Sequence, residues 1–265
     1  SIGDLFMGAF IPGLLLVILF IAYVSIRIRF RPSDAPVYQP DDIPKVEWQS
    51  LVYSLVVPLL LIMAVLGSII VGIATPSEAA SVGAMGALII ALLQRELSWS
   101  RLAEVTQSTT KTTSMVFLIL IGASIFSLVF RGYGGDELII DIFQQLPGGA
   151  LGAMFVVMLV MFLLGFILDF IEIVYVVVPI VAPALLMMGL DPIWLGVMIA
   201  INLQTSFLTP PFGFSLFYLR GVAPKEIQTS DIYRGVMPFI IIQLGLLIIL
   251  ALFPAITNWL PNLIY

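Results

Sequence analysis

The sequence contains no cysteine and no histidine, and charged residues make up only 10% of its 265 positions. Without cysteine the chain forms no disulfide and offers no thiolate for catalysis. The lack of both residue types removes the common ligands of transition-metal sites. The net charge of −5, with no basic stripe, argues against nucleic acid as a partner.

Apolar residues are what the chain has in abundance. Hydrophobic residue types account for 61% of the sequence, and the mean hydropathy is +1.15. Soluble domains do not have this composition. A chain that crosses lipid several times without strand-like alternation must satisfy its backbone hydrogen bonds within helices. We therefore expect an all-α, polytopic membrane protein whose solvent is the lipid bilayer.

The first third of the chain divides into apolar runs and polar connections. The run 8–26 is long enough to span, and Arg27, Arg29 and Arg31 follow it directly. The proline-rich segment 32–48 predicts a loop, and 51–73 predicts a second span.

A helix start is encoded after the second span. Thr75, Pro76 and Glu78 form a capping-box pattern with proline at the first helical position. A cap is the simplest role for Glu78, and a functional role stays open. The helix carries a face of small residues for close packing, namely Ala79, Gly83 and Ala87 with Ala80 and Ala84 beside them.

Two amphipathic segments flank the next span, 113–130. Residues 98–112 predict either a short helix on the membrane surface or a loop. Residues 136–146 predict a second short helix, with one apolar face formed by Leu138, Ile139, Ile142, Phe143 and Leu146.

The run 150–189 is almost wholly apolar and allows two interpretations. It predicts either two full spans with a turn near Asp169, or a re-entrant hairpin that turns inside the membrane. The turn 168–172 has no lysine, arginine, glycine or proline, which suits a tip packed inside protein better than a surface turn. Gly165 lies just before the tip, and Asp169 with Glu172 predicts a cap for the returning arm.

The run 193–219 predicts a broken transmembrane helix. It carries a polar cluster at 202–209, followed by Pro210 and Pro211. Both prolines lack an amide hydrogen, and Thr209 before them is pushed out of the α region. Freed carbonyls then lie beside hydroxyls and amides at mid-depth, an arrangement that builds ion and substrate sites in secondary transporters. A simple proline kink is the alternative.

Positive charge predicts the orientation. With the start of the first span outside, only Arg131 among the basic residues lies outside. The inside then holds Arg27, Arg29, Arg31, Lys45, Arg95, Arg101, Lys111, Arg220, Lys225 and Arg234. We expect the C-terminus to be periplasmic.

Five segments, in this order, resemble the large membrane subunit of a TRAP (tripartite ATP-independent periplasmic) transporter. They are residues 72–80, 165–169, 179–183, 191–197 and 202–221, and Leu208-Thr-Pro-Pro-Phe-Gly213 is the most specific. The resemblance covers nearly the whole chain and implies half of an inverted-repeat, elevator-type ion-transporter fold.

The resemblance also implies an arrangement of domains. Residues 1–31 would be the last span of a missing first repeat, 32–50 a cytoplasmic loop and 51–265 the second inverted repeat. The second repeat would comprise scaffold helices at 51–130, the re-entrant hairpin at 150–189, the broken helix at 193–219 and a final span at 235–260.

In function, the resemblance implies a sodium-driven importer of organic acids in the bacterial inner membrane, and no enzyme. Its expected partners are a small membrane subunit, a soluble periplasmic substrate-binding protein and the missing N-terminal half.

Site residues follow from the same resemblance, which places a sodium site between the second hairpin and the broken helix. The sodium candidates are Gly165, Asp169, Thr209 and Gly213, and the substrate candidates are Asn202, Thr205, Ser206, Pro210 and Pro211. Asp169 would supply a counter-charge or only cap a helix. Sodium is the coupling ion, and no other cofactor and no catalytic residue is expected.

Two other functions remain open at this point. A truncated transporter half could serve as a structural accessory subunit of another membrane complex, because an isolated half would expose polar and small-residue faces that need a partner. A channel is a weaker alternative.

Overall fold

The computed structural model describes residues 2–35, 48–210, 213–224 and 227–264. Within these ranges the regular structure is entirely helical. The chain forms two compact units, one of residues 1–7 and 21–110 and the other of residues 8–20 and 111–265. The units are described separately, and helices α1 (Ile2–Phe30) and α4 (Trp99–Gly132) contribute to both.

The prediction of an all-α, polytopic membrane protein is confirmed. In the part of the chain that the structure describes, six helical segments are long and apolar enough to cross a membrane. They are α1, α2 (Trp48–Ile70), α3 (Pro76–Leu93), α4, the helical segment Phe170–Met187 and α11 (Thr229–Leu252). Helices α5 (Gly135–Gln145) and α6 (Gly149–Leu164), bent by 116°, would add a seventh span if they count as one.

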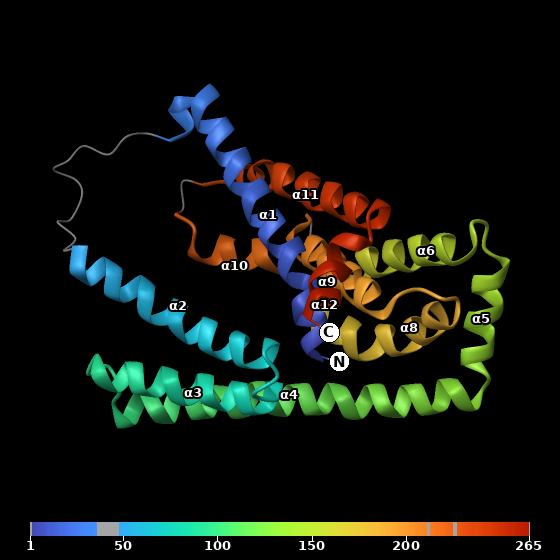
Figure 1. Ribbon diagram of the computed structural model, residues 1–265, viewed down its shortest axis with the longest axis horizontal. Coiled ribbons are helices and arrows are strands. Elements are labelled where there is room, and N and C mark those ends of the chain that lie inside the picture. The colour runs from blue at the N-terminus through green and yellow to red at the C-terminus, as the bar shows by residue number, and fades with distance from the viewer. Residues whose placement is uncertain (1, 36–47, 211–212, 225–226, 265) are drawn as a thin grey trace. The chain divides into compact units, whose positions relative to one another are not determined.

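In the first unit, α2 and α3 pack side by side (Figure 1). The predicted capping box is present, because the Glu78 amide donates to Thr75 Oγ1 at 3.4 Å and the Thr75 amide donates to the Glu78 carboxylate at 2.8 Å. The packing face of α3 differs from the prediction. A Cβ atom at Gly83 or Gly86 would meet side chains of α2, whereas Ala80, Ala84 and Ala87 are exposed.

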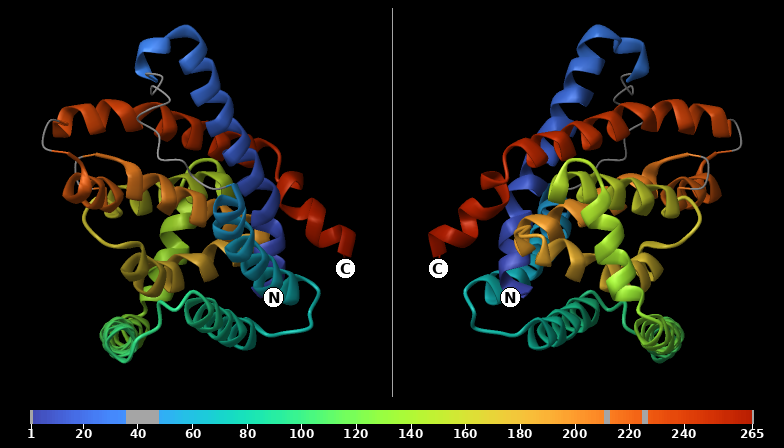
Figure 2. Two further views of the ribbon diagram at one scale, coloured as in Figure 1. Left: turned by 90° about the vertical axis from the view of Figure 1, so that its left-hand side faces the viewer. Right: turned by 90° about the vertical axis from the view of Figure 1, so that its right-hand side faces the viewer.

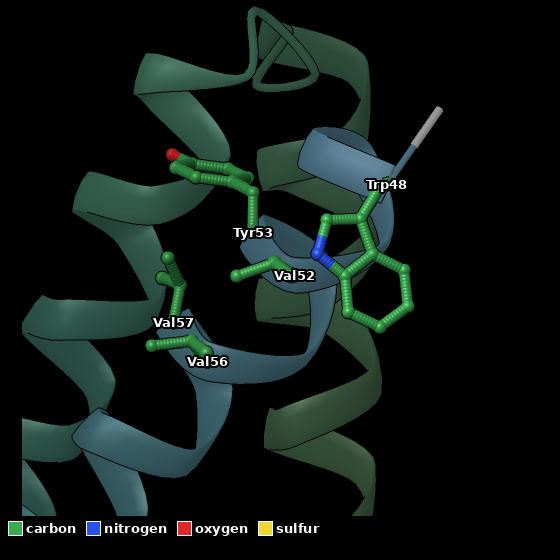
Figure 3. Close-up of a pocket in the computed structure, with 5 residues that line it drawn as sticks. All are labelled: Trp48, Val52, Tyr53, Val56 and Val57. Atoms are coloured by element: carbon green, nitrogen blue, oxygen red, sulfur yellow. The ribbon is translucent and has the colours of Figure 1, made fainter. Parts of the chain in front are cut away.

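The start of α2 forms a shallow apolar hollow of about 420 Å³ (Figure 3). It is lined by Trp48, Val52, Tyr53, Val56 and Val57. Exposed aromatic rings at the first turns of a span are typical of the membrane–water interface. Most of the loop predicted at residues 32–50 lies outside the described residues, apart from a short 3₁₀ helix, η1 (Pro32–Asp34).

Helix α4 corrects the prediction for residues 98–130. The expected surface segment 98–112 and the span 113–130 form one helix of 34 residues, about 51 Å long. No glycine or proline occurs between Trp99 and Ile121 to end the helix. The hydroxyls of Thr106 and Thr110 donate to carbonyls one turn back, so they do not compete with the helix.

Helix α5 confirms the short helix predicted at 136–146, but its buried face is rotated. Phe143 is buried, and Ile139, Ile140 and Leu146 pack against the same core. Leu138 and Ile142 are exposed instead. The helix contacts α6 and α8 (Val178–Met187), and these contacts select the buried face.

The core of the second unit is built around α9 (Pro192–Leu208), which contacts α6, α10 (Phe214–Val222), α11 and α12 (Ala255–Ile264) (Figure 1). Buried apolar side chains from six other elements surround it, including Leu16, Phe143, Val157, Met161, Ile173, Leu185, Leu246 and Leu250. The indole of Trp194 donates to the Leu250 carbonyl at 2.8 Å, which joins α9 to α11.

The last predicted span, 235–260, is divided in the structure. Helix α11 ends at Leu252, and α12 starts at Ala255. Pro254 lies between them and has no amide hydrogen to donate to a preceding carbonyl. The chain therefore turns at Phe253 and Pro254 instead of continuing as one helix.

The end of α3 generates a stability prediction. Arg95 has a φ of +58°, in the left-handed region that favours glycine. The Arg95 amide donates to Leu92 and the Glu96 amide to Ala91, which is the Schellman pattern. We expect Arg95→Gly to stabilise the protein by about 1 kcal/mol, measured as a higher melting temperature in detergent. Arg95→Lys is the control and should leave the melting temperature unchanged. A lower melting temperature for Arg95→Gly would contradict backbone strain at position 95.

Candidate functional site

The break in the polar helix is present where the sequence predicts it. Helix α9 begins with a cap, in which Asp191 accepts from the Trp194 amide at 2.7 Å, and it ends at Leu208. Thr209 is extended, with φ −89° and ψ 127°. Pro210 follows in a turn, Pro211 lies outside the described residues, and α10 starts at Phe214.

Backbone oxygens gather where the chain turns. The Gly213 amide donates to the Thr209 carbonyl at 3.1 Å. A Cβ atom at Gly213 would lie 2.8 Å from the Phe207 carbonyl oxygen and 2.9 Å from the Thr209 carbonyl oxygen. Two main-chain oxygens therefore come close to position 213, where only glycine leaves them room.

Three hydroxyls line the last turns of α9. Thr205 donates to Ile201 at 2.7 Å, Ser206 to Leu203 at 2.9 Å and Thr209 to Thr205 at 2.7 Å, each to a backbone carbonyl. Thr205 and Ser206 are fully buried. Because each hydrogen is used within the helix, the lone pairs of each hydroxyl oxygen remain to accept a donor or bind a cation.

The segment 149–187 forms a helical hairpin. Its first arm is α6, of about 24 Å, and its second arm is α7 (Phe170–Glu172), a π-helix η3 (Ile173–Val177) and α8, together about 27 Å. The arms contact each other. Asp169 accepts from the Phe170 amide at 2.7 Å, so it caps the second arm as predicted. Glu172 does not complete a capping box in the described structure.

The hairpin tip packs directly on the end of α9. A Cβ atom at Gly165 would lie 2.6 Å from Ser206 Cβ and closer still to the hydroxyl oxygen. On the other side of the tip, the rings of Phe170 and Phe207 meet edge to face, with centroids 6.1 Å apart. The tip is thus held against the end of α9, and whether the hairpin is re-entrant stays a prediction.

Asn202 links the same two elements further from the tip. Its Nδ2 donates to the Met158 carbonyl on α6 at 2.9 Å. This contact fixes the height of the hairpin along α9. The structure thus gives the Asn202 amide a structural bond, and its role toward substrate stays a prediction.

The structure brings together some of the predicted site residues and not others. Gly165 meets Ser206, and Thr209 bonds to Gly213. The Asp169 carboxylate is half-buried and caps its own helix. In the ranges that the structure covers, it makes no hydrogen bond or ion pair to the break.

Sequence reasoning missed Gln243 in α11. Its side chain is 1% exposed, and its Oε1 accepts no hydrogen bond from the described residues. It lies on the stripe of α11 that also buries Ile240, Leu246 and Leu250. The available signal was a single amide in the otherwise apolar run 235–253. The π-helix was also missed, and such turns are frequent at functional sites.

The close approach at the tip predicts the effect of adding one methyl group. Gly165→Ala is expected to destabilise the protein by about 1–3 kcal/mol, because the new Cβ overlaps Ser206. Combining it with Ser206→Gly removes the overlapping atoms and should recover part of the loss. Gly245→Ala on α11, where nothing lies within 4 Å, is the matched control for melting temperature in detergent. Equal melting temperatures for Gly165→Ala and Gly245→Ala would refute the close contact between Gly165 and Ser206.

Gln243 generates a second stability prediction. A buried acceptor without a donor costs about 1–3 kcal/mol, so the near-isosteric Gln243→Met should raise the melting temperature. Leu246→Met, on the same buried stripe, is the volume-conserving control and should change little. A melting temperature lowered by Gln243→Met would contradict a cost of the unpaired Oε1.

Comparison with known proteins agrees with this architecture. A family model described as the DctM component of the tripartite ATP-independent periplasmic transporter matches residues 1–256. The chain is 29% identical over 268 residues to the C4-dicarboxylate TRAP transporter large permease protein DctM of Pseudomonas aeruginosa, covering 99% of this chain and 60% of that protein. It is 28% identical over 266 residues to the sialic acid TRAP transporter large permease protein SiaM of Vibrio cholerae, with the same coverage of 99% and 60%.

A third relative is a larger permease protein. The isethionate TRAP transporter permease protein DctMQ of Oleidesulfovibrio alaskensis is 30% identical over 259 residues, which are 97% of this chain and 40% of that protein. The chain thus spans about 60% of the length of the first two relatives. The matched family consists of membrane transport proteins and not of enzymes. With the family model covering nearly all of its helices, the chain belongs to the DctM component family of TRAP transporters.

Proposed function

We propose that this chain forms the ion-binding part of the large permease subunit of a sodium-driven importer of organic acids. The observation that carries the proposal is the packing of the hairpin tip on the broken helix, with Gly165 against Ser206 and two carbonyl oxygens beside Gly213. Helix breaks at membrane depth build the ion and substrate sites of secondary transporters.

The oxygen atoms at the break suit a hard monovalent cation. Such ions bind carbonyl and hydroxyl oxygens, as the hard divalent cations also do. The proposed ligands are the hydroxyl and carbonyl oxygens of Thr209 and the backbone around Gly213, with Gly165 keeping the tip close. Asp169, next to the tip, would supply a counter-charge at short range. When bound, sodium would couple its own gradient to the movement of substrate.

The proposed substrate is an organic anion. The relatives named above carry C4-dicarboxylate, sialic acid and isethionate in their names. The segment 149–208 contains no lysine or arginine, so positive potential would come in part from the amide end of α10. We assign substrate contacts to Asn202, Thr205, Ser206, Pro210 and Pro211, which flank that end in sequence.

The proposed transporter has two further components. A small membrane subunit would brace the large subunit, and a soluble periplasmic binding protein would deliver the substrate. The large subunit would then carry the substrate across the membrane by an elevator-type movement. The distribution of arginine and lysine supports a periplasmic C-terminus in the bacterial inner membrane. The prediction of a separate N-terminal half stays a prediction.

Thr209 provides the test. Thr209→Val keeps the side-chain shape and removes the hydroxyl, so one neutral oxygen is lost from the proposed site. We expect the sodium concentration for half-maximal uptake to rise about tenfold in vesicles that contain the complete transporter, since a lost contact of about 1.4 kcal/mol corresponds to that factor. The measurement is uptake of a C4-dicarboxylate against sodium concentration.

Thr257→Val is the matched control. Like Thr209, Thr257 donates to a backbone carbonyl at 2.7 Å, but it is fully buried and lies on α12. Its sodium dependence should equal that of the unmodified protein. An unchanged sodium dependence in Thr209→Val would remove Thr209 from the site, and equal uptake in sodium and potassium would overturn sodium coupling itself.

A further inference from the structure

The C-terminal helix α12 is a separate element that no part of the proposed transport site uses. It follows α11 after the turn at Phe253 and Pro254, and in Figure 2 it leaves the end of α11 in a new direction. Its inner side packs on the core of its unit. Thr257 and Pro261 are buried, and the Thr257 carbonyl lies 3.2 Å from where a Cβ of Gly8 would be.

The position of α12 along the membrane normal follows from α11. Arg234 is the last charged residue of the chain, and the apolar run of α11 starts directly after it. From Arg234 to Phe253 the helix rises about 28 Å, close to the hydrocarbon thickness of about 30 Å. With Arg234 at one surface, Phe253 reaches the opposite surface, and α12 therefore begins at the membrane–water interface.

The outer stripe of α11 is apolar and exposed. Met237, Ile241, Leu244, Ile248 and Leu252 are all exposed and recur at helical spacing on one side. The opposite side, with Ile240, Leu246 and Leu250, is buried against the core. A transmembrane helix with this division turns its exposed apolar stripe to the hydrocarbon.

Exposed apolar side chains also occur at the end of α11 and on α12. Leu252 and Phe253 are followed by Trp259 and Leu263, which are 57% and 66% exposed. Amides stand beside them, because Asn258 and Asn262 line the same hollow of about 280 Å³ as Ala255, Trp259 and Leu263. The outer face of α12 is thus apolar with flanking carboxamides, and it carries no charge of either sign.

We propose that α12 is an interfacial anchor that lies on the lipid at the far end of α11, with Trp259 and Leu263 inserted at the boundary between headgroups and acyl chains. Indole rings prefer this depth because one side is apolar and the ring N–H reaches polar groups. The Asn258 and Asn262 amides pair with ester carbonyls and phosphates of the headgroups. Since α12 also packs on α9, the anchor sets the depth at which the broken helix begins.

Lipid is favoured over a protein partner by the composition of the surface. The exposed stripe of α11 from Met237 to Leu252 is apolar, and no charged residue follows Arg234 in α11 or α12. Electrostatic attraction to anionic lipid plays no part here, because α12 has no basic residue. The binding therefore depends on apolar insertion and should be insensitive to salt.

The absence of cysteine from this chain allows a direct test. The variants Trp259→Cys, Leu263→Cys and Thr257→Cys each carry one spin label in the transporter reconstituted into phosphatidylethanolamine–phosphatidylglycerol vesicles. Accessibility to oxygen, which dissolves in lipid, is compared with accessibility to a water-soluble nickel complex. Ile241, in the middle of the exposed stripe of α11, is the reference for deep lipid.

We expect labels at positions 259 and 263 to be more accessible to oxygen than to nickel, at a depth about 5–10 Å below the phosphates and shallower than at Ile241. The label at Thr257 should be shielded from both reagents. Higher accessibility to nickel at 259 and 263 would place this face in water, and shielding from both reagents would place it under a protein partner. Either result overturns the proposal, and 0.5 M salt should leave the expected pattern unchanged.

Discussion

The contact between Gly165 and Ser206 is the constraint on which the second unit depends. The hairpin tip can approach the end of α9 only because position 165 has no side chain, and Ser206 occupies the space that a Cβ would need. The Asn202 amide, bonded to the Met158 carbonyl, fixes the same two elements one helical turn away. Together these contacts hold the tip beside the break in α9, and the break is where oxygen atoms gather near Gly213.

The polar groups at the end of α9 are satisfied within the protein. Helix α9 contacts α6, α10, α11 and α12, and Thr205 and Ser206 in its last turns are buried. The hydroxyls of Thr205, Ser206 and Thr209 donate to carbonyls of their own helix. In hydrocarbon the same polar groups would cost several kcal/mol each. Gln243 stands apart from this pattern, since its Oε1 is buried without a donor in the described structure.

Local signals in the sequence predicted those elements that local chemistry controls. Thr75 and Glu78 form the expected capping box, Asp169 caps the second arm of the hairpin, and α9 stops before Pro210. The predictions failed where a boundary was inferred from polarity alone. Residues 99–130 form one helix because polar side chains on an exposed helix do not end it, and no proline occurs within α4.

The sequence by itself determined that the chain is helical, spans lipid several times and carries a proline break inside a polar cluster, because composition and missing amide hydrogens act within a few residues. Only the tertiary structure decided which residues meet. The pairing of Gly165 with Ser206 joins positions 41 apart, and the burial of Gln243 depends on α11 packing against α9. The same packing selected the buried face of α5 and left Trp259 on the outside of α12. Such choices depend on which surfaces exclude lipid or water, and no local pattern records that.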